Sequence, residues 1–311
     1  MKSLAALEQP AIVVDETEDM ASAARARLLS YVSLTKPRLV VMVLVTVVVG
    51  YLLGARGASN PSTLLATLIG TALVAGGAGA LNQWLERSRD ALMRRTARRA
   101  LPVGKITGME AVAVGLALGV LGTMILAIWA NLLAAGVALA TLLLYVLIYT
   151  PLKPVTTLNT AVGAIPGALP PMIGWASATG RLGIEAWSLF LIVFLWQFPH
   201  FLAIAWIHRE DYRRAGFRML TGDDHGGRMT GCQAVSYALT LIPAGLLPAT
   251  IGLAEGGIYF AGALALGLFY VAAAVRFWRD ASDLRARRLL RTSLVYLPAI
   301  LLLLLLSPPS S

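Results

Sequence analysis

The sequence predicts an all-α membrane protein of about nine transmembrane helices, and three observations carry this prediction. Hydrophobic residues make up 58% of the 311-residue chain and charged residues only 14%, a more apolar composition than that of a soluble protein. The chain contains apolar runs of roughly 20 residues, the length of a membrane-spanning helix. The two-residue alternation that is typical of a membrane β-barrel is absent from these runs.

The fifth of the expected spans is rich in glycine and proline, including Gly163, Pro166 and Pro170. We expect it to be kinked or broken, because such breaks are tolerated where a helix faces protein or a cavity. The nine expected spans are residues 38–55, 62–84, 109–129, 132–150, 158–177, 186–207, 231–252, 257–277 and 291–307.

The chain divides into a short tail and one membrane domain. Residues 1–30 have no long apolar run, and we expect a disordered cytoplasmic tail there. They also lack the basic and apolar regions of a cleavable signal peptide. Residues 31–311 are expected to form a single transmembrane domain. The one cysteine, Cys232, excludes an internal disulfide and a cysteine-rich metal site.

The basic residues predict the orientation of the chain. With the N-terminus inside, all of the 26 Lys and Arg except Arg56 and Arg181 fall on or near cytoplasmic segments. This asymmetry predicts a multi-pass protein of a prokaryotic plasma (inner) membrane, with a cytoplasmic N-terminus and an external C-terminus. It also explains the net charge of +10 without nucleic acid as a partner; the expected surroundings are the lipid bilayer.

A polar stretch begins inside the end of the second span. Asn82, Glu86 and Asp90 are spaced by four, so on a helix they lie along one face, and Arg94 and Arg98 extend the same spacing. Oxygen ligands beside guanidinium groups suit a diphosphate bound through Mg²⁺. The alternative interpretation is a solvated helix with ion pairs. Asn82 argues against it, because a polar group next to an apolar run is costly at membrane depth.

A second polar stretch ends the sixth span. His200 lies in an otherwise apolar segment, and His208 and Tyr212 follow at spacings that would share its helical face. An intramembrane histidine can be a proton carrier, a haem or metal ligand, or a hydrogen-bonded structural residue. Lys153, in a short cytoplasmic turn, can reach a phosphate or anchor the chain at the membrane surface.

Together these segments resemble the UbiA-type intramembrane prenyltransferases, and within them the branch that modifies haem. The resemblance covers about residues 31–300. The segments that carry it are YVSLTKPRLV at 31–40, NQWLERSRDALMRRTARRALPVGKI at 82–106, YTPLK at 149–153, NTAVGAIPGALPPMIGWASATG at 159–180 and WQFPHFLAIAWIHREDYRRAGFRML at 196–220.

The resemblance implies nine helices around a central cavity, with two polar motifs facing each other at its cytoplasmic mouth. It implies magnesium-dependent transfer of a farnesyl group from farnesyl diphosphate to the 2-vinyl group of haem B, with addition of water to give haem O. Haem B would be a substrate and not a permanent cofactor, and a downstream haem A synthase is a candidate partner.

The resemblance also assigns roles to residues of this sequence. The first motif of the family falls on Asn82, Glu86 and Asp90, which we expect to hold Mg²⁺. The second falls on the 208–212 region, where His208, Asp211 and Tyr212 would orient phosphate, metal or water. The expected substrate-binding residues are Arg94, Arg98, Lys105 and Lys153 for the phosphates, and His200 and Trp206 elsewhere in the site.

The sequence departs from the family pattern at three positions. The family usually has Asp where Ser88 stands, Pro at Ala100 and a basic residue at Pro154. Without a carboxylate at position 88, Glu86 and Asp90 are the clearest metal ligands of this segment.

Three other functions compete with this interpretation. A prenyltransferase of the same type could act on another acceptor, such as a quinone precursor. A secondary transporter would also have a broken helix and polar residues at mid-membrane. However, a transporter needs polar groups on both sides of the membrane, and the polar groups of this sequence are concentrated on the cytoplasmic side. A haem-binding assembly factor would bind haem and ignore farnesyl diphosphate.

Overall fold

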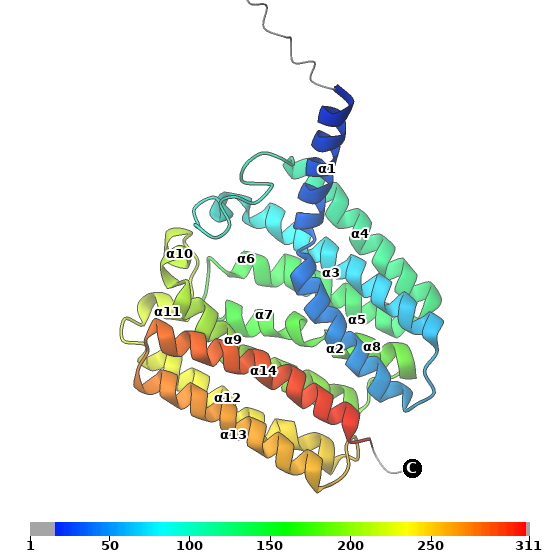
Figure 1. The fold of residues 1–311 in the computed structure, drawn as a ribbon, viewed down its shortest axis with the longest axis vertical. Coiled ribbons are helices and arrows are strands. Elements are labelled where there is room, and N and C mark those ends of the chain that lie inside the picture. Colours follow the sequence, from blue (N-terminus) through cyan, green and yellow to red (C-terminus); the bar gives the residue numbers. More distant parts are fainter. Residues whose placement is uncertain (1–15, 309–311) are drawn as a thin grey trace, which may run out of the picture.

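The computed structural model describes residues 16–308, and within that range the chain folds as a bundle of helices (Figure 1). The predicted tail is only partly covered, because residues 1–15 lie outside the described residues. Its remainder is helical: α1 (Glu16–Leu34) corrects the prediction of disorder up to residue 30. Alanine, arginine and leucine in this segment favour a helix. Glu110 accepts hydrogen bonds from Arg27 (2.6 Å) and Tyr31 (2.7 Å) and so ties α1 to the bundle.

Eight stretches of helix in the described part of the chain are long and apolar enough to cross a membrane. They match eight of the nine predicted spans. Their bounds are α2 (Pro37–Ala55), α3 (Pro61–Asp90), α4 (Gly108–Trp129), the composite Leu132–Leu152, α9 (Ile184–Ile207), α12 (Arg228–Thr250), α13 (Gly257–Arg279) and α14 (Asp283–Leu306).

The remaining span is broken, as its composition predicts. It consists of α7 (Asn159–Ala168) and α8 (Pro170–Thr179), which meet at Leu169. Pro170 and Pro171 have no backbone N–H to donate to the preceding turn, so they begin a new helix instead of continuing α7. Neither half alone is long enough to cross a bilayer.

The fourth span is also irregular. It begins as α5 (Leu132–Leu143), widens into a π-helical turn over Leu144–Tyr149, and ends as α6 (Thr150–Leu152). π-Helical turns in α-helices are rare and occur frequently at functional sites. Two short helices, α10 (Arg209–Arg214) and α11 (Leu220–Asp223), follow the polar end of α9.

Glycine allows the broken span to pack closely against α2. A Cβ atom added to Gly174 of α8 would overlap the carbonyl oxygen of Val47, and one added to Gly50 of α2 would overlap that of Pro171. The two backbones are therefore in direct contact, with no side chain between them. Small residues at such crossings are typical of helix packing in membranes.

Apolar side chains also cover the outside of the bundle. Only 28–56% of the most apolar window in each candidate span is buried inside the protein. Large side chains such as Leu116 and Val120 of α4 are more than half exposed. Exposed apolar surface on this scale marks a membrane-facing surface, so this multi-pass membrane protein presents it to lipid.

We expect Gly174→Ala to lower the free energy of unfolding by about 2 kcal/mol, because the backbone of α2 cannot move aside as a flexible side chain could. Thermal unfolding in detergent would measure the loss. The matched control is Gly136→Ala in α5, where no atom lies within 4 Å of the added Cβ. Alanine favours the helix there, so equal destabilisation by both substitutions would contradict the packing argument.

Candidate functional site

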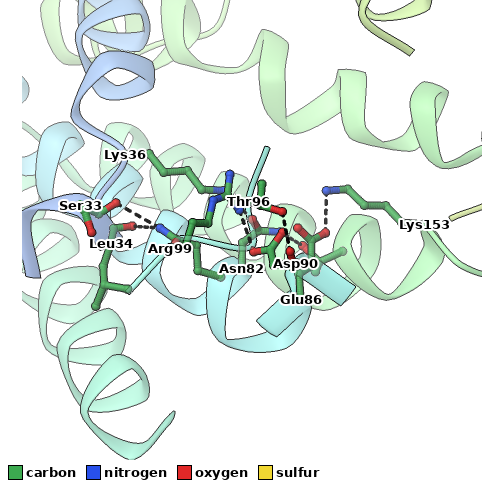
Figure 2. A network of polar contacts seen from close by, with 11 residues as sticks. Ser33, Leu34, Lys36, Asn82, Glu86, Asp90, Thr96, Arg99 and Lys153 are labelled. Carbon is green, nitrogen blue, oxygen red and sulfur yellow. Dashed lines mark hydrogen bonds and ion pairs between the residues drawn. The ribbon is translucent and has the colours of Figure 1, made fainter. Parts of the chain in front are cut away.

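The end of α3 buries three polar side chains on one face. Asn82, Glu86 and Asp90 are 0%, 6% and 1% exposed, respectively, and all three belong to α3. Figure 2 shows them close together. The four-residue spacing that predicts a common face is therefore confirmed. The helix does not continue to Arg94, because α3 ends at Asp90.

Each of these three oxygen-bearing side chains is bound by a different basic residue (Figure 2). The Lys36 ammonium donates to Asn82 Oδ1 over 2.5 Å. Lys153 Nζ lies 2.6 Å from Glu86 Oε1, and Arg99 Nη1 lies 2.7 Å from Asp90 Oδ2. The cations come from three separate segments of the chain, so this row of contacts is a tertiary site and not a feature of α3 alone.

Lys36 is a site residue that the sequence analysis did not identify. It immediately precedes α2, and its backbone lies in the left-handed region with φ at 52°. That conformation costs roughly 1–2 kcal/mol for a residue with a Cβ and is found where the surroundings hold the residue firmly. Burial lowers the pKa of Lys36 to about 7. The sequence does contain a signal for this residue, because Lys36 directly precedes the first predicted span.

Both polar atoms of the Asn82 amide are hydrogen-bonded. Its Nδ2 donates to Thr150 Oγ1 over 3.0 Å, and Thr150 in turn donates to the carbonyl oxygen of Tyr145 over 2.8 Å. Thr150 and Tyr145 lie at the π-helical turn and its end, so the irregular part of the fourth span positions the amide. The neighbouring Gln83 anchors the chain before Lys36, donating to the carbonyl oxygen of Leu34 over 2.9 Å.

Lys153 joins the first motif to the segment that follows α9. Its ammonium lies 4.6 Å from the centre of the Tyr149 ring and 5.7 Å from that of Phe217. Burial by itself lowers the pKa of Lys153, but Tyr149 and the Glu86 carboxylate outweigh it and raise the pKa above its usual value. Lys153 therefore stays protonated at neutral pH, as a phosphate-binding group must.

The other predicted phosphate-binding residues lie farther out. Arg94, Arg98 and Lys105 are exposed in the segment between α3 and α4. Because the chain turns at residue 91 and folds back, Arg99 reaches Asp90 and Arg98 does not. The extension of the helical row to Arg94 and Arg98 is thus wrong, because it assumed that the helix continued.

The second motif does not form a single helical face. α9 ends at Ile207, His208 adopts a non-helical conformation, and Tyr212 lies on the separate helix α10. The Asp211 carboxylate accepts a hydrogen bond from Arg214 over 2.8 Å. Burial and the positive charge of Arg95 lower the pKa of His208.

The two motifs nevertheless meet. Tyr212 packs edge-on against Phe217 at 6.0 Å, and Phe217 also faces Lys153. Arg89 of α3 donates to the carbonyl oxygen of Ala215 over 2.7 Å. The backbone N–H of Arg218 donates to the carbonyl oxygen of Lys153 over 2.8 Å.

A cavity of about 210 Å³ opens at this junction. It is lined by Leu85, Glu86, Arg89, Thr150, Pro151, Pro154 and Phe217.

His200 and Trp206 do not join this junction through any contact among the described residues. His200 bonds to Ser293 of α14 instead. Trp206 packs edge-on against Phe277 of α13 at 5.8 Å and under the guanidinium of Arg209. The polar contacts of the junction come from α3, from residues 36, 99 and 153, and from residues 212–218.

The donor set fits a magnesium ion. No group of three His, Cys, Asp or Glu that could hold a metal occurs in the described part of the chain, but Mg²⁺ commonly uses only one or two carboxylates together with substrate phosphates. Glu86 and Asp90 supply that pair. Asp90 Oδ1 is fully buried and has no hydrogen-bond partner, so it has an oxygen available for a cation.

Comparison with known proteins gives concordant matches. The model of the UbiA prenyltransferase family matches residues 43–297. A protoheme IX farnesyltransferase of Solibacter usitatus is 47% identical over 288 residues, which cover 90% of this chain and 98% of that protein. One of Salinibacter ruber is 40% identical over 275 residues, covering 88% of this chain and 97% of that protein.

Solved structures share the fold at low sequence identity. A digeranylgeranylglyceryl phosphate synthase aligns with a TM-score of 0.76 at 16% identity, over 91% of this chain and 98% of that one. A UbiA homologue from Archaeoglobus fulgidus, bound to GPP and Mg²⁺, aligns with a TM-score of 0.66 at 15% identity, over 88% of this chain and 99% of that one.

Neighbouring arginines test the ion pair at Asp90. We expect Arg99→Met to lower the free energy of unfolding by about 2 kcal/mol, because it leaves the Asp90 carboxylate buried without its cation. Arg99 is itself 27% exposed, so the loss should fall below that of a fully buried pair. Arg98→Met changes an exposed side chain, so we expect it to change the free energy of unfolding by no more than about 0.5 kcal/mol. Equal stability of the two variants, measured by thermal unfolding, would contradict this pairing.

Proposed function

The chain belongs to the UbiA prenyltransferase family, and on that premise we propose that it transfers the farnesyl group of farnesyl diphosphate to the 2-vinyl group of protohaem IX (haem B), with addition of water, to form haem O. The protein is a membrane-embedded transferase. The observation that carries the proposal is the match to relatives named protoheme IX farnesyltransferase, at 47% and 40% identity over most of the chain. The buried row at Asn82, Glu86 and Asp90 is where we place the diphosphate chemistry.

The basic contacts of this row explain how the site can accept a diphosphate. Lys153 and Arg99 neutralise the carboxylates of Glu86 and Asp90, and Lys36 donates a hydrogen bond to the amide of Asn82. On binding, these cations would turn toward phosphate oxygens, which accept charge-assisted hydrogen bonds equally well. The exposed Arg94, Arg98 and Lys105 would form an outer ring of positive charge that attracts the diphosphate.

Asn82, Glu86 and Asp90 would hold Mg²⁺ in this arrangement. When bound, Mg²⁺ supplies positive charge that neutralises the diphosphate as it leaves. The UbiA homologue of A. fulgidus was solved with Mg²⁺, which supports the same requirement here. The residues of the chain then have two tasks: to shield Glu86 and Asp90 from water, and to present Lys153 to the leaving group.

The transfer step follows from these groups. The bond between the allylic carbon and the diphosphate oxygen breaks, and the leaving diphosphate keeps the electron pair beside the basic residues. The haem vinyl group attacks the allylic carbon, and water adds to the resulting cation with loss of a proton. The apolar surroundings limit premature capture by water. We propose that His208, Asp211 and Tyr212 orient phosphate or water, and that His200 and Trp206 help to position haem.

The orientation proposed for the membrane places this site on the cytoplasmic side. In that arrangement the N-terminus is cytoplasmic, the C-terminus is external, and the membrane is the plasma membrane of a prokaryote. A downstream haem A synthase, which would consume the product, is a candidate partner.

The function is tested by incubating the purified protein with haem B, farnesyl diphosphate and Mg²⁺, followed by mass analysis of the porphyrin. We expect a product with one farnesyl group and one added water. A quinone precursor offered as acceptor should give none. Farnesylation of the quinone precursor and not of haem would favour the competing prenyltransferase, and unmodified haem with no farnesyl transfer would contradict the proposal.

The metal-binding role of the row is tested by Glu86→Gln and Asp90→Asn. Each removes a charge at nearly constant volume, and we expect farnesyl transfer to fall by about 100-fold or more, the scale seen for lost transition-state electrostatics. Ser88→Ala is the matched control, because Ser88 lies exposed on the same helix and should retain near-normal turnover. Magnesium-dependent turnover at the normal rate in both carboxamide variants would remove these residues from the metal site.

The orientation is tested by cysteine labelling in intact cells, starting from a Cys232→Ser background. Ser59 and His225 are both exposed and lie in segments proposed for opposite sides of the membrane. We expect an impermeant maleimide to label Ser59→Cys without cell lysis and His225→Cys only after it. The reverse pattern would invert the proposed topology.

A further inference from the structure

His200 is the histidine that lies inside a membrane-crossing helix of the described chain, and its ring is fixed by a residue of another helix. Its Nδ1 lies 2.8 Å from the hydroxyl oxygen of Ser293. Ser293 belongs to α14 and is completely buried. A hydrogen bond between a ring nitrogen and a buried side chain at this depth sets which nitrogen carries the proton.

The hydroxyl of Ser293 favours one tautomer of His200. It donates its one hydrogen to the carbonyl oxygen of Leu290 over 2.6 Å, and a carbonyl oxygen can only accept. With that hydrogen on the Leu290 carbonyl, the hydroxyl oxygen accepts from His200, and this arrangement puts the hydrogen on Nδ1 and the lone pair on Nε2. This is the neutral form of imidazole that can bind a metal ion through Nε2.

A second contact holds the ring plane. The indole of Trp196 stacks on the imidazole with ring centres 4.8 Å apart and 26° between the planes. The Nε1–H of Trp196 also donates to the backbone carbonyl oxygen of Ser293 over 2.8 Å. The same tryptophan thus fixes both the ring of His200 and the piece of α14 that bonds to it.

Nε2 of His200 is left open. Among the described residues it has no hydrogen-bond partner, and it is not one of the fully buried polar atoms that lack one, so it is accessible. Gln197, three positions earlier, donates to the carbonyl oxygen of Ala164 on α7. Because residues three apart are neighbours on a helix, the imidazole lies on the face of α9 between α7 and α14.

We propose that Ser293 is a positioning residue that fixes His200 as its Nδ1–H tautomer, so that His200 Nε2 ligates the iron of the haem substrate. The inference rests on the proposed function, because it takes haem as the acceptor. His200 is seven residues before the end of α9, so its backbone lies about 10 Å along the helix axis from that end. The macrocycle then lies in the apolar part of the protein, while the diphosphate is held at its cytoplasmic rim.

Haem titration of the purified full chain in lipid nanodiscs tests this without turnover. Ferric protohaem IX is added, and the Soret band, the electron paramagnetic resonance spectrum and the dissociation constant are recorded against empty nanodiscs. We expect His200→Ala to change both spectra and to recover the original signal when free imidazole is added. We expect Ser293→Ala to weaken haem binding about tenfold, the lower range for removing a partner of a ligating histidine.

Two further variants separate positioning from general structural damage. Ser293→Thr keeps the hydroxyl and should restore the affinity and the spectrum. Ser188→Ala in α9 removes a buried hydroxyl that makes the same bond to a carbonyl three residues earlier, to Glu185 over 2.7 Å, with no histidine beside it. It should leave haem binding unchanged. Unchanged thermal unfolding of each variant would confirm that it folds.

The outcomes are distinct. Unchanged spectra and affinity in His200→Ala would overturn the assignment of His200 as the ligand. A spectral change in His200→Ala with none in Ser293→Ala would overturn the positioning role of Ser293. Failure of the wild-type protein to farnesylate haem would instead contradict the proposed function. That failure is measured by mass analysis of the product, which is independent of the haem titration.

Discussion

The site depends on the neutralisation of charges that are buried where the bundle meets the edge of the membrane. Glu86 and Asp90 are almost completely shielded from water, and an unpaired carboxylate in such surroundings costs several kcal/mol. Lys153 and Arg99 remove that cost, and Lys36 donates a hydrogen bond to the uncharged amide of Asn82. The basic groups that stabilise these side chains are also the groups that a diphosphate would recruit, so the requirements of stability and of binding coincide.

The irregular helices give this site its shape. The π-helical turn of the fourth span carries the backbone carbonyl that fixes Thr150, and Thr150 fixes Asn82. The break at Leu169 allows α8 to pack against α2 through Gly50 and Gly174, and Lys36 lies at the start of α2. The π-helical turn therefore contacts the row directly through Thr150, whereas the break packs against α2 at Gly50, fourteen residues after Lys36.

Two regions of the protein then divide the proposed reaction. The charged junction of α3, Lys153 and the 212–218 segment would bind the diphosphate, while His200 and Trp196 lie deeper on α9 and contact Ser293 of α14. Neither region alone could join a charged leaving group to a large apolar acceptor. Their separation along α9 suits a substrate whose charged head stays near the membrane surface while its chain lies in the apolar interior.

The sequence by itself determined the membrane class, the spans, the break in the fifth span, the family and the shared face of Asn82, Glu86 and Asp90. The family follows from the resemblance of several sequence segments, and the other features follow from local hydropathy, proline chemistry and helical period. Only the tertiary structure decided that Lys36 and Arg99 reach this face, that Arg98 does not, and that α9 stops before Tyr212. Which cation meets a buried carboxylate depends on how separate segments fold back together, and sequence spacing carries no record of that.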